Sequence, residues 1–295
     1  MAPTNPQTDP QGFKRVGNTS FAEALNRKVY AVISLDISGS MSLDIGGLTA
    51  CDRKTGEPCS RIRAALDDAR MYASQLIGGM QMYRLDLLLF GQTLHTHPNI
   101  TSLEAFDQAI RGVEYRLEGG TRLDLALEYA NKAFESLKSQ PPPPDYVDPG
   151  AAAAAAAPQP TVTFFNLVLT DGAPSFPGLN TDQIRDNIAK ILIKGMEPMT
   201  SDLDRGTSFI RYGSSPDVVA FMQFLDDELK DRALAYFRQI YPANPDVLRL
   251  VHDYVDTGAQ CQTWRDKGMR ASFKVDPRSR WDDDIKAIVA VSLAD

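Results

Sequence analysis

Several residue types and patterns that mark whole classes of protein are scarce or missing in this chain of 295 residues. Its three cysteines are too few for a disulfide scaffold, and no apolar stretch approaches the length of a membrane span. Residues 1–18 lack the apolar core of a signal peptide, so we expect an intracellular, cytoplasmic protein. Because Lys and Arg form no run and the net charge is −7, neither nucleic acid nor an anionic membrane is expected as the main partner.

The chain does contain apolar runs that alternate with amphipathic stretches. Runs typical of buried strands occur at 29–35, 85–90, 163–170 and 207–212. A short antiparallel edge strand is expected at 93–97. Amphipathic helices are expected at 61–77, 103–112, 123–137 and 183–192. Strands that alternate with helices of this length predict an α/β fold, with a doubly wound, mostly parallel central sheet and helices on both faces.

The first strand ends at a group of oxygen-bearing side chains. Asp36, Ser38 and Ser40 recur at a spacing of two, which keeps their side chains on one side of an extended segment, and Gly39 permits a bend. One carboxylate and two hydroxyls form an oxygen-only set, which suits Mg²⁺ or Mn²⁺ better than zinc or copper. Taken alone, the string is also compatible with an ordinary strand-to-loop junction.

Two further strings strengthen the metal hypothesis. Thr121 follows Gly119 and Gly120 at the start of a helical stretch, and Asp171 ends another apolar strand. The alternative is that these residues only cap helices, since Asp and Thr are favoured at such positions. Capping alone does not explain three such strings in this order.

Together the three strings resemble the metal-ion-dependent adhesion site of von Willebrand factor A (vWA) domains, the Rossmann-like fold also seen in integrin I domains. The family has D-x-S-x-S after its first strand, a threonine in a glycine-led loop and an aspartate after its fourth strand. The resemblance covers most of the chain and implies an intact site, with each aspartate acting directly or through a bridging water. It implies that the metal is held by Asp36, Ser38, Ser40, Thr121 and Asp171. It also implies that a partner protein's Asp or Glu carboxylate completes the metal's shell.

The remaining sequence is expected to frame one domain at 21–295. Residues 1–20 are predicted to be a disordered lead-in. An insertion at 42–59 leaves the end of the first strand, so it is expected on the side of the site, as a lid or partner-selecting loop or as a simple surface excursion. The proline- and alanine-rich insertion at 141–160 joins a helix to the start of a strand and is expected at the opposite pole.

A helical C-terminal extension is expected from about residue 214. Its Leu225-Asp226-Asp227 and Val255-Asp256-Thr257 strings resemble those of intracellular A-domain proteins from fungi and other eukaryotes. The end of the chain predicts a final helix or a last strand.

The metal-site residues and the family resemblance together predict a non-enzymatic module that binds a partner protein through a divalent metal. The sequence offers no paired general acid and base, no nucleophile with a histidine and no phosphate-cradling loop. A haloacid-dehalogenase-type, metal-dependent phosphatase also has an aspartate after its first strand, but its second carboxylate would fall at Ser38. A third possibility is an accessory vWA subunit of an ATPase or chaperone-type complex.

Overall fold

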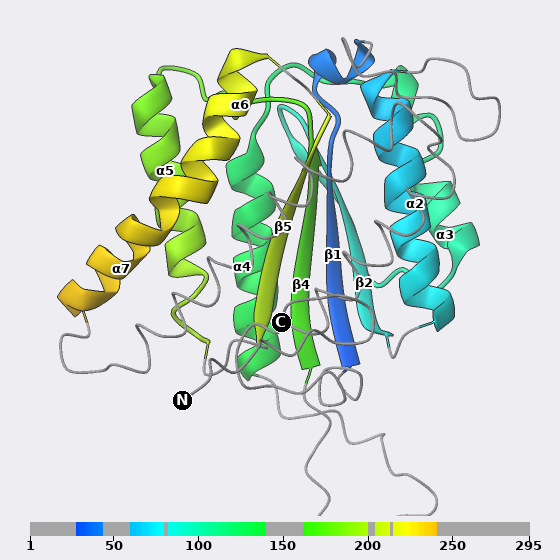
Figure 1. Cartoon of the computed structure of the whole chain (residues 1–295). Coiled ribbons are helices and arrows are strands. Elements are labelled where there is room, and N and C mark those ends of the chain that lie inside the picture. The colour runs from blue at the N-terminus through cyan, green and yellow to red at the C-terminus, as the bar shows by residue number, and fades with distance from the viewer. Residues whose placement is uncertain are drawn as a thin grey trace, which may run out of the picture.

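The computed structural model describes residues 28–43, 60–79, 82–139, 162–199, 204–212 and 215–240. These residues are built around a 5-stranded sheet with the order β3-β2-β1-β4-β5 (Figure 1). The strands are β1 Lys28–Asp36, β2 Met82–Phe90, β3 Leu94–His97, β4 Val162–Thr170 and β5 Arg205–Arg211. Each strand overlaps a run that the sequence predicts, so the strand predictions are confirmed.

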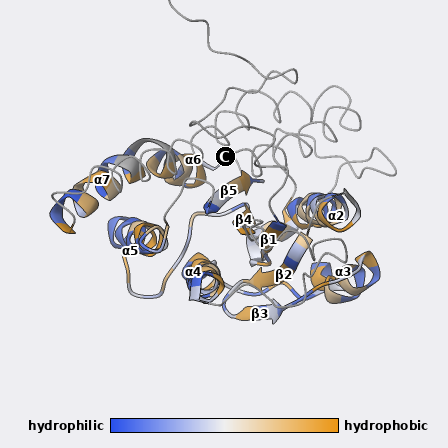
Figure 2. Ribbon diagram, turned by 90° about the horizontal axis from the view of Figure 1, so that it is seen from below, coloured by the Kyte–Doolittle hydropathy of each residue, from blue (hydrophilic) through white to orange (hydrophobic). Residues whose placement is uncertain are grey.

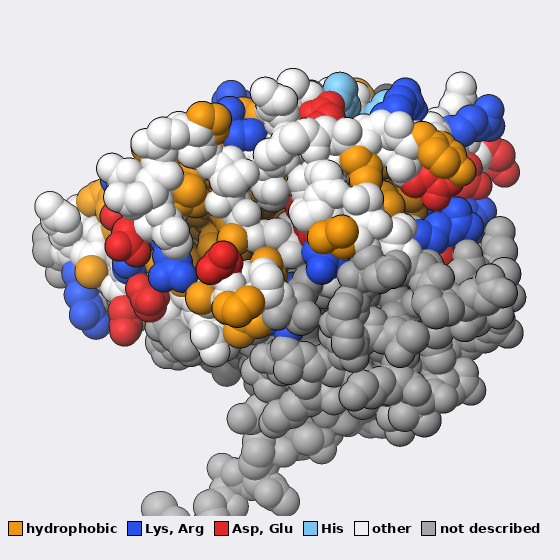
Figure 3. All heavy atoms as spheres, turned by 90° about the horizontal axis from the view of Figure 1, so that it is seen from above, with side chains coloured by type: hydrophobic (Ala, Val, Ile, Leu, Met, Phe, Trp, Pro, Cys, Tyr) orange, Lys and Arg blue, Asp and Glu red, His pale blue; other side chains and the backbone are white. Residues whose placement is uncertain are grey.

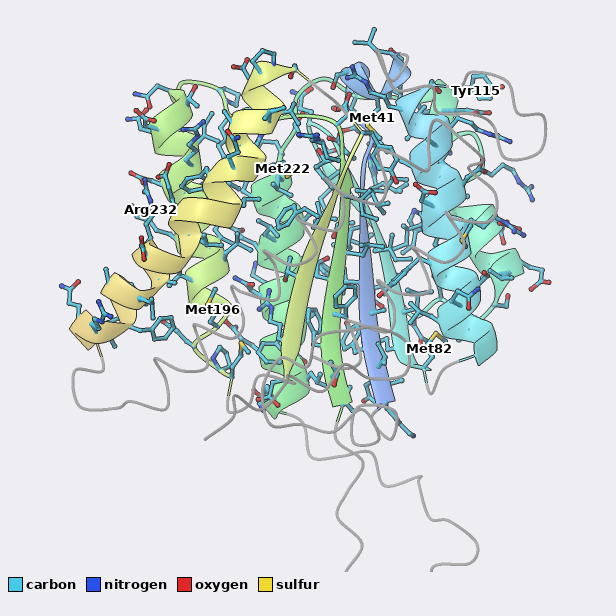
Figure 4. All side chains as sticks on the ribbon, in the orientation of Figure 1. Met41, Met82, Tyr115, Met196, Met222 and Arg232 are labelled. Atoms are coloured by element: carbon cyan, nitrogen blue, oxygen red, sulfur yellow. The ribbon has the colours of Figure 1, made fainter. Side chains whose placement is uncertain are left out.

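The strands of the sheet run parallel except for β3, which pairs antiparallel with β2 at one edge of the sheet. Because β1, β2, β4 and β5 point the same way, their last residues meet at one end, called the carboxyl edge below. Met41, just beyond β1, lies at the carboxyl edge, and Met82, the first residue of β2, lies at the opposite end (Figure 4). The polar residues that end β1 and β4 therefore share an edge.

Helices cover both faces of the sheet (Figures 1 and 2). Helices α2 and α3 lie over one face, and α4 and α5 lie over the other, with α6 and α7 continuing along α5. The α-helices are α2 Arg61–Gly79, α3 Leu103–Ala109, α4 Leu123–Ser139, α5 Thr181–Lys194, α6 Pro216–Gln223 and α7 Leu229–Ile240. Short turns of other helix types are η1 Gly39–Ser42, η2 Val113–Tyr115 and η4 Phe224–Glu228. The doubly wound α/β architecture is confirmed.

The central strand β1 explains why both faces must be covered. Ala31 and Ile33 belong to the core beneath α2 and α3, whereas Tyr30 and Val32 belong to the core beneath α4 and α5. All four side chains are buried. A parallel strand that is apolar on both sides is stable only between two helical layers.

Beyond β5, the described residues from Pro216 to Ile240 are helical. Helix α6 passes through the π-helical turn η4 into α7. Arg232 of α7, labelled in Figure 4, forms an ion pair with Asp186 of α5. The Tyr236 hydroxyl donates to Glu197 Oε1 at 2.6 Å. These contacts hold α7 against α5 and the turn that follows it.

Some predictions differ from the structure or fall outside the described residues. The helix predicted over 103–112 ends earlier, at Ala109, because the chain turns at Gly112, whose φ of 70° is left-handed. Outside the described residues lie the lead-in, most of the first insertion, the second insertion and the second C-terminal string, at 1–20, 44–59, 141–160 and 255–257. In the described part of the chain, no helix has the length and apolar character needed to cross a membrane.

Candidate metal centre

The first string lies where β1 ends at the carboxyl edge. Asp36 is the last residue of β1, and its Oδ1 accepts a hydrogen bond from the Ser38 backbone N–H at 2.8 Å. The Oγ atoms of Ser38 and Ser40 are 3.1 Å apart. The chain is extended through Ser38, and the bend expected at Gly39 opens the η1 turn, so Ser40 lies in a turn and not in an extended segment. It is this turn that brings the two serine hydroxyls together.

The third string joins the first through a direct hydrogen bond. Ser40 Oγ donates to Asp171 Oδ1 at 2.8 Å. Asp171 follows β4, which pairs with β1 so that Leu35 lies opposite Leu169. Between β1 and β4 the strand order changes direction, since the chain adds β2 on one side of β1 and later β4 on the other. Ligand sites of doubly wound sheets form at such switch points.

The threonine of the second string lies against the same place. Ser175 fixes its backbone by accepting from the Thr121 N–H through Oγ and donating its own N–H to the Thr121 carbonyl, both at 3.1 Å. A Cβ added to Gly172 would lie 3.4 Å from Thr121 Oγ1 and 3.9 Å from Ser40 Oγ. The two hydroxyls therefore flank the bare α-carbon of Gly172, and a larger residue there would fill the space between them.

The five predicted residues thus come together from three separate segments. Four of them are buried and Ser40 is half-buried, so Ser40 marks the side of the cluster that opens toward the surface. Two carboxylates and three hydroxyls form an oxygen set that fits a hard cation such as Mg²⁺, with water in the remaining positions. In the described residues, no group of three or more His, Cys, Asp or Glu is placed to hold a metal, so any such ion depends on the hydroxyls.

The environment of Asp36 is unfavourable for a bare charge. Burial raises the pKa of the Asp36 carboxyl to about 6, although hydrogen bonds from Thr170 and Ser38 counteract the shift. Thr170 Oγ1 donates to Asp36 Oδ2 at 2.6 Å. A cation bound here would replace the solvation that Asp36 has lost.

The sequence did not identify two residues that contact the predicted ligands. Thr170 holds Asp36, and the only signal for it was strand pairing, which the sequence alone does not reveal. Arg61, the first residue of α2, places Nη1 at 2.5 Å from Asp171 Oδ2. No local pattern indicated this ion pair, because the two residues are 110 positions apart.

Seen from above the carboxyl edge, acidic, basic and hydrophobic side chains are interspersed (Figure 3). Over the described part of this face no single sign of charge dominates. Among the exposed large hydrophobic side chains, Leu43, Tyr115 and Leu179 all lie in turns or loops rather than in long helices or strands. The described part of this face is therefore mixed in character.

No family model and no curated protein matches the chain. The fold is similar to the crystal structure of an aerotolerance-related membrane protein from Bacteroides fragilis, with 18% identity, a TM-score of 0.35, and 62% of this chain and 67% of that one covered. It is also similar to the conserved hypothetical protein BatB from Bacteroides thetaiotaomicron, with 17% identity, a TM-score of 0.36, and 62% and 66% covered. The fold class rests on the sheet order and the helix layers described above, and no function follows from these likenesses.

Proposed function

We propose that this chain is a divalent-metal-dependent protein-binding module of the von Willebrand A type that works inside the cell. The observation that carries the proposal is the convergence of Asp36, Ser40 and Asp171, with Ser38 and Thr121, at the switch point of the sheet. Helix caps or strand ends would not require hydroxyls and carboxylates from three segments to meet.

In the proposed site the protein provides few charged ligands, but it holds the oxygen atoms of its ligands close together before the metal binds. Bound Mg²⁺ or Mn²⁺ would supply an electrophilic position to which an Asp or Glu carboxylate of a partner protein binds. Ser38 and Ser40 are held 3.1 Å apart by the η1 turn, and Ser40 Oγ already contacts Asp171. The half-buried Ser40 lies on the open side, where the partner carboxylate would approach.

The same residues favour binding over phosphatase chemistry. A phosphatase of the kind that the strand-end aspartate suggests needs a second carboxylate two residues later, and that position is Ser38. The Ser38 hydroxyl points to Ser40 at 3.1 Å, as expected of a metal ligand in this proposal. The proposal is accordingly a binding module without catalytic activity of its own.

The test combines metal titration with partner capture. In calorimetry, Asp36→Ala and Thr121→Ala should each weaken Mg²⁺ binding roughly 100-fold or more, since each removes a ligand. Asp182→Ala, which removes an exposed acid at the start of α5, is the control and should bind Mg²⁺ like the wild type.

Partner capture from a lysate should succeed in Mg²⁺ and fail in EDTA, and both ligand variants should capture nothing in either condition. Unchanged Mg²⁺ affinity in Asp36→Ala and Thr121→Ala would refute the proposal. Turnover of a phosphate ester would favour the phosphatase instead.

A further inference from the structure

The guanidinium of Arg61 lies inside the proposed metal centre. Its Nη1 is 2.5 Å from Asp171 Oδ2 and 3.5 Å from the Ser40 carbonyl oxygen. The Asp171 side chain is fully buried and that of Arg61 is 15% exposed. An ion pair this deeply placed is not screened by solvent as a surface pair is. Arg61 is therefore a strong electrostatic influence on the residues that would hold the metal.

The backbone fixes Arg61 in this place. Its N–H donates to the Leu43 carbonyl at 3.0 Å, which joins the turn after β1 directly to the first residue of α2. Leu43 N–H in turn donates to the Ser40 carbonyl at 3.1 Å. Leu43, near the start of the 42–59 insertion, and Arg61, just after its end, thus meet beside Ser40. Arg61 is positioned by the same turn that positions the serines.

We propose that Arg61 competes with the divalent metal for Asp171. Resting on the proposed function, this inference adds that the guanidinium neutralises Asp171 in the metal-free protein and must leave that carboxylate when the ion binds. With Asp36 and Asp171 ionised, Arg61 leaves the cluster with one net negative charge instead of two. Because the positive guanidinium and a divalent ion repel each other strongly where solvent is excluded, Arg61 lowers the affinity of the cluster for the metal.

Competition of this kind sets the metal concentration at which the site loads. A protein without Arg61 would hold the ion at a lower concentration, but its metal-free form would have two buried carboxylates without a counter-ion. The arginine therefore makes the metal-free and metal-bound forms closer in stability. Partner binding, which needs the ion, would then respond to the metal supply and would not be constitutive.

The experiment compares Mg²⁺ affinity in the wild type, Arg61→Gln and Arg63→Gln by calorimetry. Arg63 is the matched control, since it lies on the same helix and pairs with Glu114, at 3.7 Å, instead of with a proposed ligand. Arg61→Gln should bind Mg²⁺ about tenfold more tightly than the wild type, and Arg63→Gln should bind it equally. Equal or weaker binding by Arg61→Gln, with the wild type binding normally, would overturn the role of Arg61 and leave the metal site standing.

The free energy of unfolding, measured with denaturant at a series of Mg²⁺ concentrations, is a second readout. It can be measured even for a variant that folds only when the metal is bound. In EDTA, Arg61→Gln should be less stable than the wild type, and its stability should begin to rise at a lower Mg²⁺ concentration. A rise at the same or a higher concentration would refute the competition. If neither protein bound or responded to Mg²⁺, the proposed function itself would fall together with the inference.

Discussion

Two buried carboxylates in adjacent strands of the sheet differ in whether a nearby cationic side chain balances their charge. The first, Asp86 in β2, accepts hydrogen bonds from the hydroxyls of Tyr30 and Tyr129 at 2.7 and 2.9 Å and from the Asn99 N–H at 2.8 Å. Its charge is balanced by Arg84, whose Nε is 2.8 Å from Asp86 Oδ1. This carboxylate is fully occupied by the protein, and we regard it as structural.

The second carboxylate, Asp36 in β1, accepts only from neutral donors. Ser38 N–H and Thr170 Oγ1 occupy its two oxygens, and no cationic side chain of the described residues pairs with it. Burial consequently raises its pKa to about 6. Asp86 and Asp36 are both fully buried, so burial alone does not separate an acid whose charge Arg84 balances from the proposed metal-binding acid. The difference is whether a described cationic side chain balances the charge: Arg84 does so at Asp86, and none of the described residues does so at Asp36.

The largest effect should come from neutralising the two acids in turn. Asp86→Asn should lower the free energy of unfolding by about 2–4 kcal/mol, because it leaves Arg84 without its partner and both tyrosine hydroxyls with a poorer acceptor. Asp36→Asn should be no less stable than the wild type at neutral pH, since it removes a buried charge that lacks a counter-ion. Urea unfolding without metal measures both, and equal losses would end the comparison.

The pH dependence of stability should separate the acids further. The folded pKa of Asp36, about 6, lies above its model value of 3.8, so folding favours the protonated form. The stability that this group contributes is complete below about pH 4 and is lost as pH rises through 6. Without metal, the unfolding free energy of the wild type should therefore fall by about 2 kcal/mol relative to Asp36→Asn between pH 4 and 7. A constant difference would show that Asp36 is not destabilised by ionisation.

The affinity for the metal should depend on the same titration of Asp36, but it should fall at low pH, where the stability rises. A proton and the ion compete for Asp36, so the affinity for Mg²⁺ should weaken by up to about tenfold for each pH unit below 6 and level off above it. Calorimetry across this range measures the effect. Stabilities measured alongside at each pH exclude unfolding as the cause. An affinity independent of pH in this window would mean that Asp36 does not contribute to metal binding.

The smallest effect is expected from the proline- and alanine-rich insertion at 141–160. Helix α4, which ends just before it, is tied by Lys138 to Asp204 at the start of β5, at 2.9 Å, which places this helix end at the edge opposite the site. Replacing the insertion with a short Gly/Ser linker should leave Mg²⁺ affinity unchanged and alter stability by less than about 1 kcal/mol. A clear loss of metal binding would contradict the predicted position of the insertion.

Much of the architecture could be predicted from local patterns. The run at 29–35 is apolar except for Ser34, and a strand buried on both faces needs such a run, so β1 was found with little error. The stripe that predicts a helix at 123–137 likewise matches α4. The helix predicted at 103–112 was too long because its apolar spacing continues to Ile110, beyond the end of α3 at Ala109. Periodicity indicates which face is buried but not where a chain changes direction.

The proposed site was only partly accessible to the same reasoning. Asp36, Ser38 and Ser40 were identified by their spacing, but the approach of the two serine hydroxyls depends on the η1 turn that begins at Gly39. Thr170 and Arg61 were not identified, although each contacts a proposed ligand. Their partners are 134 and 110 residues away, and no local pattern specifies a contact at that distance along the chain.

The sequence by itself determined the alternation of strands and helices and the kinds of atoms available at the strand ends, because side-chain chemistry and hydrophobic periodicity are local properties. Only the tertiary structure decided that β1 and β4 are neighbours, that Asp36 pairs with no cationic side chain of the described residues, and that Arg61 reaches Asp171. Burial and charge compensation depend on which segments pack together. Both properties arise when the helices pack on the two faces of the sheet, so neither can be read from a single segment.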